Sequence, residues 1–297
     1  MIRENNSVMY KSEKYNSDEA GREPRNESRR QFLTRSVLTG AGLAIAPLLL
    51  APQAAEAGGL FAAPSPADQK KVGDQAAQQV LQKYHEVFDA RARHFNTIGQ
   101  RLVSALPPSD RTTWNFRFHV LDSSEVNAFA LPGGNMFMFT GLYKLLSTDD
   151  ALAGVTGHEM THVRKQHWAQ ASAKTQEREA GIGILLGIFH AGRAAQTLAG
   201  LANSAVGLKF SRGEEDQADE GGLQNMVAAG YNPEGMIQLF NALEKVSGNG
   251  GGLGGDFLSN HPLTSDRIKH TQQRIAALHS ARRFPPLTPM NYSSLCG

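Results

Sequence analysis

The chain has 297 residues, of which 40% are hydrophobic and 20% are charged, which is ordinary globular composition and enough for one large domain or two small ones. The formal net charge of +2 argues against nucleic acid as a partner. Cys296 is the only cysteine, so an intrachain disulfide is excluded.

The first 57 residues have the layout of an export signal. The stretch RRQFL at 29–33 is followed by an apolar run at 37–50 and by the small-x-small sequence AEA at 55–57. Paired arginines before Phe-Leu resemble the twin-arginine signal type. The run is shorter than the roughly 20 residues that span a membrane, although an uncleaved inner-membrane anchor is the alternative. We predict a cleaved signal peptide with a long polar n-region at 1–57, a periplasmic location, and one domain at 58–297.

A helix and a small sheet are predicted next. Apolar residues recur at three- and four-residue spacing over 66–106, which predicts one long helix ended by Pro107-Pro108. Residues 115–140 are rich in aromatic and β-branched side chains that alternate with polar ones, as strands require. A turn is expected at 132–134. This pattern predicts an antiparallel sheet of about three strands.

Helices are predicted for much of the remaining chain. Ser147 and Thr148 precede two aspartates, which is a typical helix start. Residues 180–208 are small and apolar and are interpreted as packed helices, with contact to a membrane surface as the alternative. A helix over 211–230 is closed by Gly230, and the six glycines within 247–256 predict a flexible loop. The fold class is therefore α+β and mainly helical.

The helix that starts near Thr148 carries the sequence His158-Glu-x-x-His162. Residues four apart share one face of a helix, so these two imidazoles can occupy two corners of a tetrahedral zinc site. Glu159 lies beside them and could take a proton from the attacking water. The alternative is a solvated, charged helix face.

A downstream helix offers further ligands. Lys165 and Trp168 stand where a metzincin needs glycine and histidine, so that class is excluded. Glu215 and Asp219 are also four apart: the first can ligate zinc, and the second can accept the free ring N–H of a ligating histidine. Two histidines, one glutamate and an open position for water make a catalytic site with one Zn²⁺ per chain.

Four stretches in this order resemble zinc metallopeptidase family forty-eight, which includes CAAX prenyl proteases, HtpX and BepA-like proteases. They are VNAFALPGGNMFMFTGLY at 126–143, GHEMTHVRKQH at 157–167, SRGEEDQAD at 211–219 and NHPLTSDRI at 260–268. The resemblance implies a gluzincin-type peptidase domain whose sheet lies beside the active-site helix. It assigns the ligand glutamate to Glu215 rather than Glu214. We expect the soluble periplasmic type, without the transmembrane helices or tetratricopeptide repeats of other members.

The resemblance also implies roles for other residues. His261 matches a removable fourth zinc ligand, with a loop histidine that touches no metal as the alternative. Arg267 could stabilise the oxyanion of the tetrahedral intermediate or pair with a carboxylate. His167 is expected to make structural hydrogen bonds near the site rather than to act in catalysis. The extended substrate would pair with an exposed edge strand made of Asn127, Ala128, Phe129 and Ala130.

The sequence thus predicts an exported zinc endopeptidase. By resemblance, its substrates are misfolded or unassembled envelope proteins. One rival is a chaperone-like binding or assembly factor that keeps the peptidase fold with little turnover, although an intact Glu159 argues against it. A second rival is a zinc hydrolase for a non-peptide amide.

Overall fold

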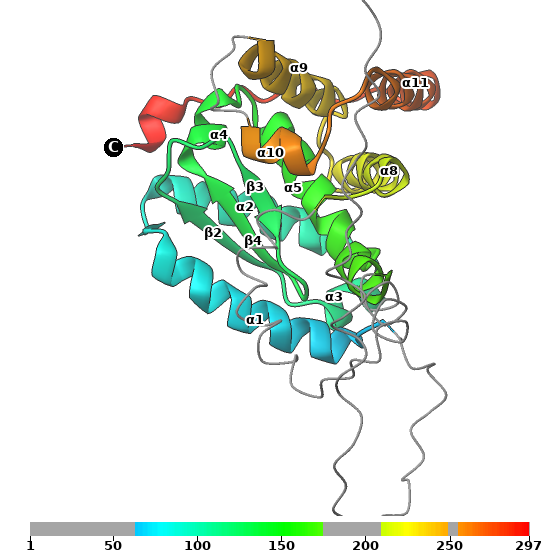
Figure 1. Cartoon of the computed structure of the whole chain (residues 1–297). Helices are drawn as coiled ribbons and strands as arrows, with labels where there is room; N and C mark the ends of the chain where they lie inside the picture. The colour runs from blue at the N-terminus through cyan, green and yellow to red at the C-terminus, as the bar shows by residue number, and fades with distance from the viewer. Residues whose placement is uncertain (1–62, 175–208, 249–254, 297) are drawn as a thin grey trace, which may run out of the picture. The chain divides into compact units, whose positions relative to one another are not determined.

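The computed structural model describes residues 63–174, 209–248 and 255–296. All of them belong to one unit of the chain, residues 56–297. Helices surround a small sheet (Figure 1), which confirms the mainly helical α+β class. Across these residues, no helix is long and apolar enough to cross a bilayer.

Some predictions fall outside the described residues. They are the signal peptide at 1–57 and the helices, with their membrane contact, at 180–208. Most of the glycine-rich loop at 247–256 also lies outside them.

Two helices replace the single helix predicted over 66–106. The elements are α1 (Pro66–Lys83), β1 (Glu86–Val87) and α2 (Ala90–Ser104). The Asp89 side chain starts α2 by accepting a hydrogen bond of 2.8 Å from the backbone N–H of Arg91. This cap begins a second helix, and the segment that separates it from α1 contains no proline or glycine. Apolar spacing alone therefore did not reveal the break.

The sheet has four strands in the order β1-β2-β4-β3. The other strands are β2 (Arg117–Leu121), β3 (Ala128–Ala130) and β4 (Asn135–Phe139). β1–β2 and β3–β4 pair antiparallel, but the central pair β2–β4 is parallel. The sheet has one strand more than the roughly three predicted, and the prediction that it is antiparallel throughout is wrong for the central pair. After β2 the chain crosses to the far edge before it turns back as β4, and strand propensity carries no information about that crossing.

The turn between β3 and β4 packs tightly against α1. Gly133 and Gly134 have φ values of +88° and +119°, which favour glycine, so the predicted turn is confirmed. A Cβ atom on Gly73 would lie 1.6 Å from the carbonyl oxygen of Pro132. Only glycine allows this approach, which fixes the end of β3 against α1.

Side chains of β4 alternate between two cores. Phe137 and Phe139 pack with α1, including Val80. Met136 and Met138 point to the larger core, to which α2 and α5 contribute. The sheet therefore lies between α1 on one face and the main helical layer on the other (Figure 1).

The main helical layer is built around α5 (Asp149–Arg164). The remaining elements are α3 (Pro108–Thr113), α4 (Thr140–Leu145), α8 (Arg212–Ala228), α9 (Glu234–Gly248), α10 (Gly255–Asn260), α11 (Ser265–Ala281) and the 3₁₀ turn η3 (Tyr292–Leu295). Every residue of α5 from Asp150 to Val163 is buried. A solvated helix face is therefore excluded as the setting of its histidines.

The predicted helix start at Thr148 and the predicted helix end near Gly230 are confirmed. The Thr148 side chain accepts from the backbone N–H of Ala151 and starts α5. Ser211 starts α8 with a reciprocal capping box to Glu214. Gly230, with φ +77°, follows the end of α8. These ends are set by residues within one helical turn, so the sequence predicts them directly.

The C-terminal segment anchors the start of α5. The backbone N–H of Asp149 donates to the carbonyl of Thr288 at 2.9 Å. The buried Asp150 carboxylate accepts from the backbone N–H groups of Thr288 and Asn232, both at 2.7 Å. The helix is thus held at its first turn by two distant parts of the chain.

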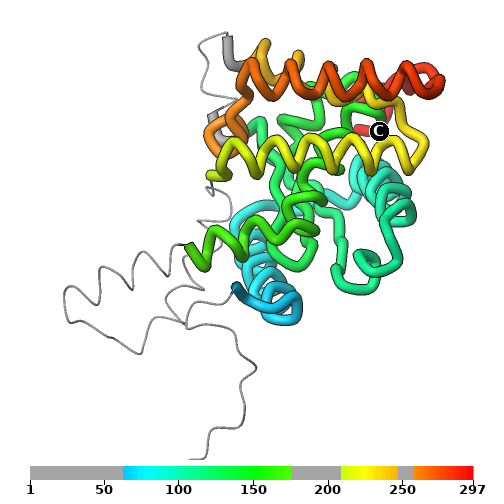
Figure 2. The backbone as a smooth tube through the Cα atoms, turned by 90° about the vertical axis from the view of Figure 1, so that its right-hand side faces the viewer, coloured from blue at the N-terminus to red at the C-terminus, as the bar shows by residue number. Residues whose placement is uncertain are grey.

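Glycines let α5 and α8 approach closely. A Cβ on Gly222 would lie 2.9 Å from the backbone nitrogen of His158, and one on Gly221 would lie 2.5 Å from Cγ2 of Thr161. α8 in turn runs beside α11 (Figure 2). Carboxylate side chains are short, so this close packing is what allows residues of α8 to reach the α5 histidines.

Candidate metal centre

Three elements bring four ligand-type side chains together. His158 and His162 come from α5, Glu215 comes from the first turn of α8, and His261 follows α10. One donor atom from each lies within 4.8 Å of the others, and all four residues are buried. Within the described part of the chain, this is the one group of His, Cys, Asp and Glu with such geometry. We call it the candidate metal centre.

The donor spacing fits a tetrahedral cation. Nε2 of His158 lies 3.1 Å from Nε2 of His162 and 3.3 Å from Nδ1 of His261. Oε1 of Glu215 lies 2.9 Å from His261 Nδ1 and 3.5 Å from His162 Nε2. Ligands at about 2.0–2.1 Å from a tetrahedral zinc lie about 3.3–3.4 Å from one another. The donor set therefore has the size and chemistry of a zinc site.

Electrostatics favours the metal-binding forms of His162 and Glu215. At His261, by contrast, burial lowers the pKa, but the carboxylates of Glu159 and Glu215 outweigh it and raise that pKa. Burial, together with the neighbouring imidazoles, holds the pKa of His162 well below its ordinary value, so this ring is neutral. Burial opposes ionisation of Glu215, but the charges of His261, His158 and Arg267 and the hydrogen bond from His261 together outweigh it, so the net pKa of Glu215 is lowered. A neutral imidazole and an ionised carboxylate are the states that bind a metal.

Glu159 lies beside the ligands but is not one of them. Its Oε2 accepts a hydrogen bond of 3.0 Å from the backbone N–H of Ala130 in β3. Its Oε1 has no hydrogen-bond partner and lies 3.4 Å from Nε2 of His261. Burial raises the pKa of Glu159, which suits a group that accepts and returns a proton.

The sequence predicts that Asp219 accepts from a ligating histidine without specifying which, and the structure shows that it contacts His158. Its Oδ1 lies 2.9 Å from Nδ1 of His158, which leaves Nε2 of that ring facing the other donors. Arg267 holds both carboxylate oxygens of Asp219 at 2.7 Å. Burial opposes ionisation of Asp219, but these bonds lower its pKa to about 2.

Arg267 takes the second of its two predicted roles. Besides Asp219, its Nη1 lies 2.7 Å from Oε2 of Glu215 and donates to the carbonyl of Pro262 at 3.0 Å. The guanidinium is buried and engaged by these acceptors. The structure thus favours carboxylate pairing over oxyanion stabilisation.

His162 is oriented by a chain of neutral side chains. Its Nδ1 lies 2.9 Å from Nδ1 of His167, whose Nε2 lies 3.3 Å from Oε1 of Gln217. If Nε2 of His162 offers its lone pair to the centre, its Nδ1–H donates to His167, and His167 Nε2–H donates to Gln217. His167 is therefore a hydrogen-bonding residue, as expected. Gln217 was not identified from the sequence.

A left-handed turn brings His167 back to the centre. α5 ends at Arg164, and Gln166 has φ +56°, the single positive φ of a non-glycine residue in the described chain. The Gln69 amide of α1 donates to Gln166 Oε1 at 2.8 Å and supports this turn. No sequence pattern linked Gln69 to Gln166, because the contact spans two elements.

His261 is more firmly packed than the sequence suggested. The glycine-rich stretch predicted a loop histidine that supports no core, but His261 directly follows α10 and is 3% exposed. Its backbone N–H donates to the carbonyl of Phe257, and the two rings stack with centroids 4.8 Å apart. The expectation of a mobile loop side chain is therefore wrong, whereas its role as a removable zinc ligand stays a prediction.

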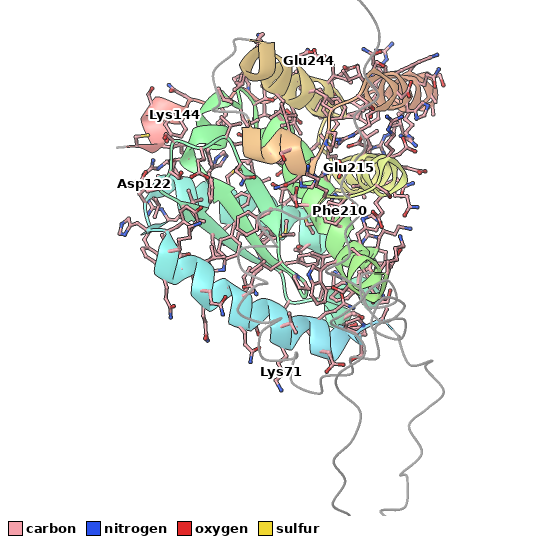
Figure 3. All side chains as sticks on the ribbon, viewed as in Figure 1. Lys71, Asp122, Lys144, Phe210, Glu215 and Glu244 are labelled. Carbon is pink, nitrogen blue, oxygen red and sulfur yellow. The ribbon has the colours of Figure 1, made fainter. Side chains whose placement is uncertain are left out.

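Phe210 covers one side of the centre. Its ring stacks on His162 with centroids 3.9 Å apart. Figure 3 labels Phe210 and Glu215, which lie near each other at the start of α8. Phe210 stands directly before Ser211, the residue that caps α8. Sequence reasoning missed Phe210, since a single phenylalanine outside any motif gives no signal.

β3 (Ala128–Ala130) is an edge strand, whereas Asn127, which the prediction included, precedes it. The side chains of Asn127, Ala128 and Phe129 are buried, so only the backbone edge can be open to a substrate. Leu131 N–H donates to Asn135 O, and Phe139 N–H donates to Asn127 O. Because such bonds alternate along an antiparallel pair, the backbone groups of Ala128 and Ala130 point away from β4. The outer side of the edge therefore faces Glu159, which already accepts from Ala130.

Comparison with known proteins places these features in a family. A model described as Peptidase family M48 matches residues 89–275. The Beta-barrel assembly-enhancing protease of Yersinia pestis is 29% identical over 68% of this chain and 43% of its own. The protein of the same name from Escherichia coli (strain K12) is 30% identical over 61% of this chain and 38% of its own.

A relative from outside the bacteria is also similar. The Mitochondrial metalloendopeptidase OMA1 of Schizosaccharomyces pombe is 27% identical over 69% of this chain and 60% of its own. The chain thus spans less than half the length of the two bacterial relatives. The match of the family model covers more than half of this chain and includes the α5 histidines and Glu215. The chain belongs to peptidase family M48, the metallopeptidase family that its four motifs resembled.

Proposed function

We propose that this chain is an exported zinc-dependent endopeptidase that cleaves misfolded or unassembled proteins of the cell envelope. The observation that carries the proposal is the convergence of His158, His162, Glu215 and His261 at tetrahedral spacing, with the free oxygen of Glu159 beside them. Three imidazoles and one carboxylate in this arrangement suit zinc better than magnesium or calcium, which prefer oxygen ligands.

In the proposed reaction, His158, His162 and Glu215 would hold the metal and His261 would be a removable fourth ligand. A bound zinc ion would polarise the peptide carbonyl and make a water molecule more acidic. Glu159 accepts the proton of the attacking water and passes it to the leaving amine. Asp219, held by Arg267, fixes the ring of His158, and His167 fixes that of His162.

The proposed substrate is an extended, unfolded polypeptide. The outer backbone groups of β3 are at the edge of the sheet, where an extended chain can add a further strand. Folded proteins seldom offer a free extended segment, so this mode of binding selects unfolded chains. The names of the relatives, an assembly-enhancing protease and a mitochondrial metalloendopeptidase, support quality control of envelope proteins. The arginine pair at 29–30 supports export.

The test measures metal content and proteolysis on the purified full-length protein. We expect one zinc per chain, degradation of unfolded casein, loss of degradation with a chelator, and recovery on adding zinc. Glu159→Gln is the matched variant, because it removes only the base: it should keep the metal and lose about 100-fold or more in rate.

Each alternative gives a different result. A protein that binds zinc and unfolded casein without cleaving it would be the chaperone-like factor. A protein that hydrolyses only small amides would be the non-peptide hydrolase. Wild-type rates in Glu159→Gln would remove Glu159 as the base.

A further inference from the structure

We propose that Gln69, which lies on α1 and outside the four family motifs, is a positioning residue for the candidate metal centre. Its amide holds a strained turn at Gln166, and that turn returns His167 to the ring of His162. The proposal rests on the metal-binding role proposed above and adds to it a residue that acts through two others.

The turn after α5 has a backbone conformation that glutamine seldom adopts. α5 ends at Arg164, and Gln166 follows two residues later with φ +56°. Helices commonly end with a residue in this left-handed conformation, but that residue is usually glycine, because a Cβ atom is strained there. A strained residue persists only where its surroundings hold it, so this turn needs support from another part of the chain.

Gln69 supplies that support through its side chain. Its Nε2 donates to Oε1 of Gln166 and to the carbonyl of Pro64, both at 2.8 Å. A backbone carbonyl can only accept, so the contact with Pro64 fixes which end of the Gln69 amide carries the hydrogens. Gln69 is 1% exposed, so water has little access to the bond. The Gln166 side chain is therefore held from a buried site on α1.

α1 cannot shift easily away from this contact. Gln69 and Gly73 are four residues apart and share one face of the helix. At Gly73 the helix lies so close to the turn between β3 and β4 that a Cβ atom would be 1.6 Å from the carbonyl oxygen of Pro132. Beside it, Asp74 accepts a hydrogen bond of 2.9 Å from the Asn135 amide of β4. The amide of Gln69 is thus fixed relative to the sheet.

The turn determines where His167 lies relative to the centre. His167 directly follows Gln166 and is buried, and its Nδ1 lies 2.9 Å from Nδ1 of His162. Nδ1–H of His162 needs this acceptor if its Nε2 is to face a metal. A change of the backbone at Gln166 would move His167 and lengthen the contact, which would leave His162 free to rotate or to change tautomer.

Two substitutions at position 166 separate the turn from the side chain. Gln166→Ala and Gln166→Gly both remove the bond to Gln69, and they differ by one methyl group. Alanine is strained at a positive φ, whereas glycine adopts it without cost to its side chain. We therefore expect Gln166→Ala to loosen the turn and Gln166→Gly to keep it. Residue 166 is half-buried beyond the end of α5, so both variants should fold.

Gln69→Met tests the donor itself. Methionine fills a similar volume but has no hydrogen to donate to Gln166. The double variant Gln69→Met/Gln166→Gly should behave like Gln166→Gly alone, because a turn without strain needs no support. Gln78→Met is the matched control, since Gln78 is an exposed glutamine on the same helix.

The first measurement is zinc affinity, by chelator competition with the purified full-length protein. We expect Gln69→Met and Gln166→Ala to bind zinc about tenfold more weakly than the wild type, at the low end for residues that orient metal ligands. Gln166→Gly, the double variant and Gln78→Met should stay within about twofold of the wild type. A loss in Gln69→Met that Gln166→Gly does not restore would overturn the proposal, because Gln69 would then not act through the turn.

The second measurement needs no metal. Long-range proton–nitrogen NMR of the metal-free protein reports which ring nitrogen of each histidine carries the hydrogen. We expect Gln69→Met and Gln166→Ala to change the signals of His162 and His167, and Gln166→Gly to leave them as in the wild type. Wild-type signals in both Gln69→Met and Gln166→Ala would show that the two rings do not depend on the turn, and the proposal would be wrong.

These measurements separate the proposal from the endopeptidase function, because neither of them uses a substrate. If the variants behave as expected but casein is not cleaved, only the endopeptidase function fails. If casein is cleaved and every variant matches the wild type in zinc affinity and in the histidine signals, Gln69 is not a positioning residue.

Discussion

Two neighbouring glutamates in the first turn of α8 have different tasks. Glu214 accepts from the backbone N–H of Ser211 at 2.8 Å and completes the helix cap. Glu215 faces the other side, where its Oε1 meets Nδ1 of His261 at 2.9 Å. Successive helical residues point about 100° apart, so one carboxylate serves the fold and the other serves the candidate metal centre.

We predict that Glu215→Gln loses zinc affinity while Glu214→Gln keeps it. A glutamine at position 214 can still accept from Ser211, so its cost in unfolding free energy should stay below about 1 kcal/mol. Competition with a chelator measures the first effect and urea unfolding the second. If Glu214→Gln loses the metal and Glu215→Gln keeps it, the metal ligand is Glu214.

His261→Ala should bind zinc more weakly and cleave unfolded substrates, or itself, faster. Removal of the imidazole opens a metal position, as expected for a removable ligand. Because the ring also stacks on Phe257, the metal-free protein should lose about 1–3 kcal/mol of stability. His270→Ala is the matched control, since that side chain is 51% exposed on α11. Unchanged metal affinity with lower activity would mean that His261 is not a removable ligand.

At the scale of elements, the distance between α5 and α8 determines whether the carboxylates reach the histidines. A methyl group at position 222 would lie 2.9 Å from the backbone of His158. Gly222→Ala should therefore push the helices apart, weaken zinc binding and cost about 1–3 kcal/mol. Urea unfolding of the metal-free protein and a chelator competition measure the two effects.

Gly213 provides the control on the same helix. A Cβ there has no atom within 4 Å, so Gly213→Ala should leave zinc affinity unchanged and stabilise α8 by up to about 1 kcal/mol. Equal loss of zinc affinity in Gly213→Ala and Gly222→Ala would show that α8 responds to any alanine, and not to the contact with α5.

The sequence predicted what depends on neighbours along the chain. The four-residue spacing placed His158 and His162 on one face and put Asp219 on the same face of its helix as Glu215, but it did not say which histidine Asp219 would contact. It did not predict the parallel β2–β4 pair or the Gln217–His167 contact, because each joins segments tens of residues apart. Phe210 was missed for the same reason. Its role depends on which ring lies opposite, and only the packing of α8 against α5 determines that.

At the scale of the whole molecule, the proposed export would determine where the proposed protease meets its substrates. We predict that changing Arg29 and Arg30 together to lysine keeps the precursor in the cytoplasm, because the receptor reads the arginine pair. Cell fractionation and the size of the product measure this. Arg22→Lys with Arg25→Lys makes the same charge-preserving change outside the pair and should be exported. Normal processing of the Arg29/Arg30 variant would indicate the general secretory route.

The hydrogen bond from Ala130 to Glu159 couples recognition to chemistry. The Ala130 N–H has one hydrogen, and in this structure it is held by the base itself. A polypeptide that pairs with β3 through a backbone carbonyl must compete with Glu159 for that hydrogen. Once displaced, the carboxylate has a second free oxygen at the moment the scissile bond arrives. Oε1 of Glu159 is free in either case, so a small amide with no backbone to offer would leave the Ala130 hydrogen bond in place and meet a base with one free oxygen rather than two.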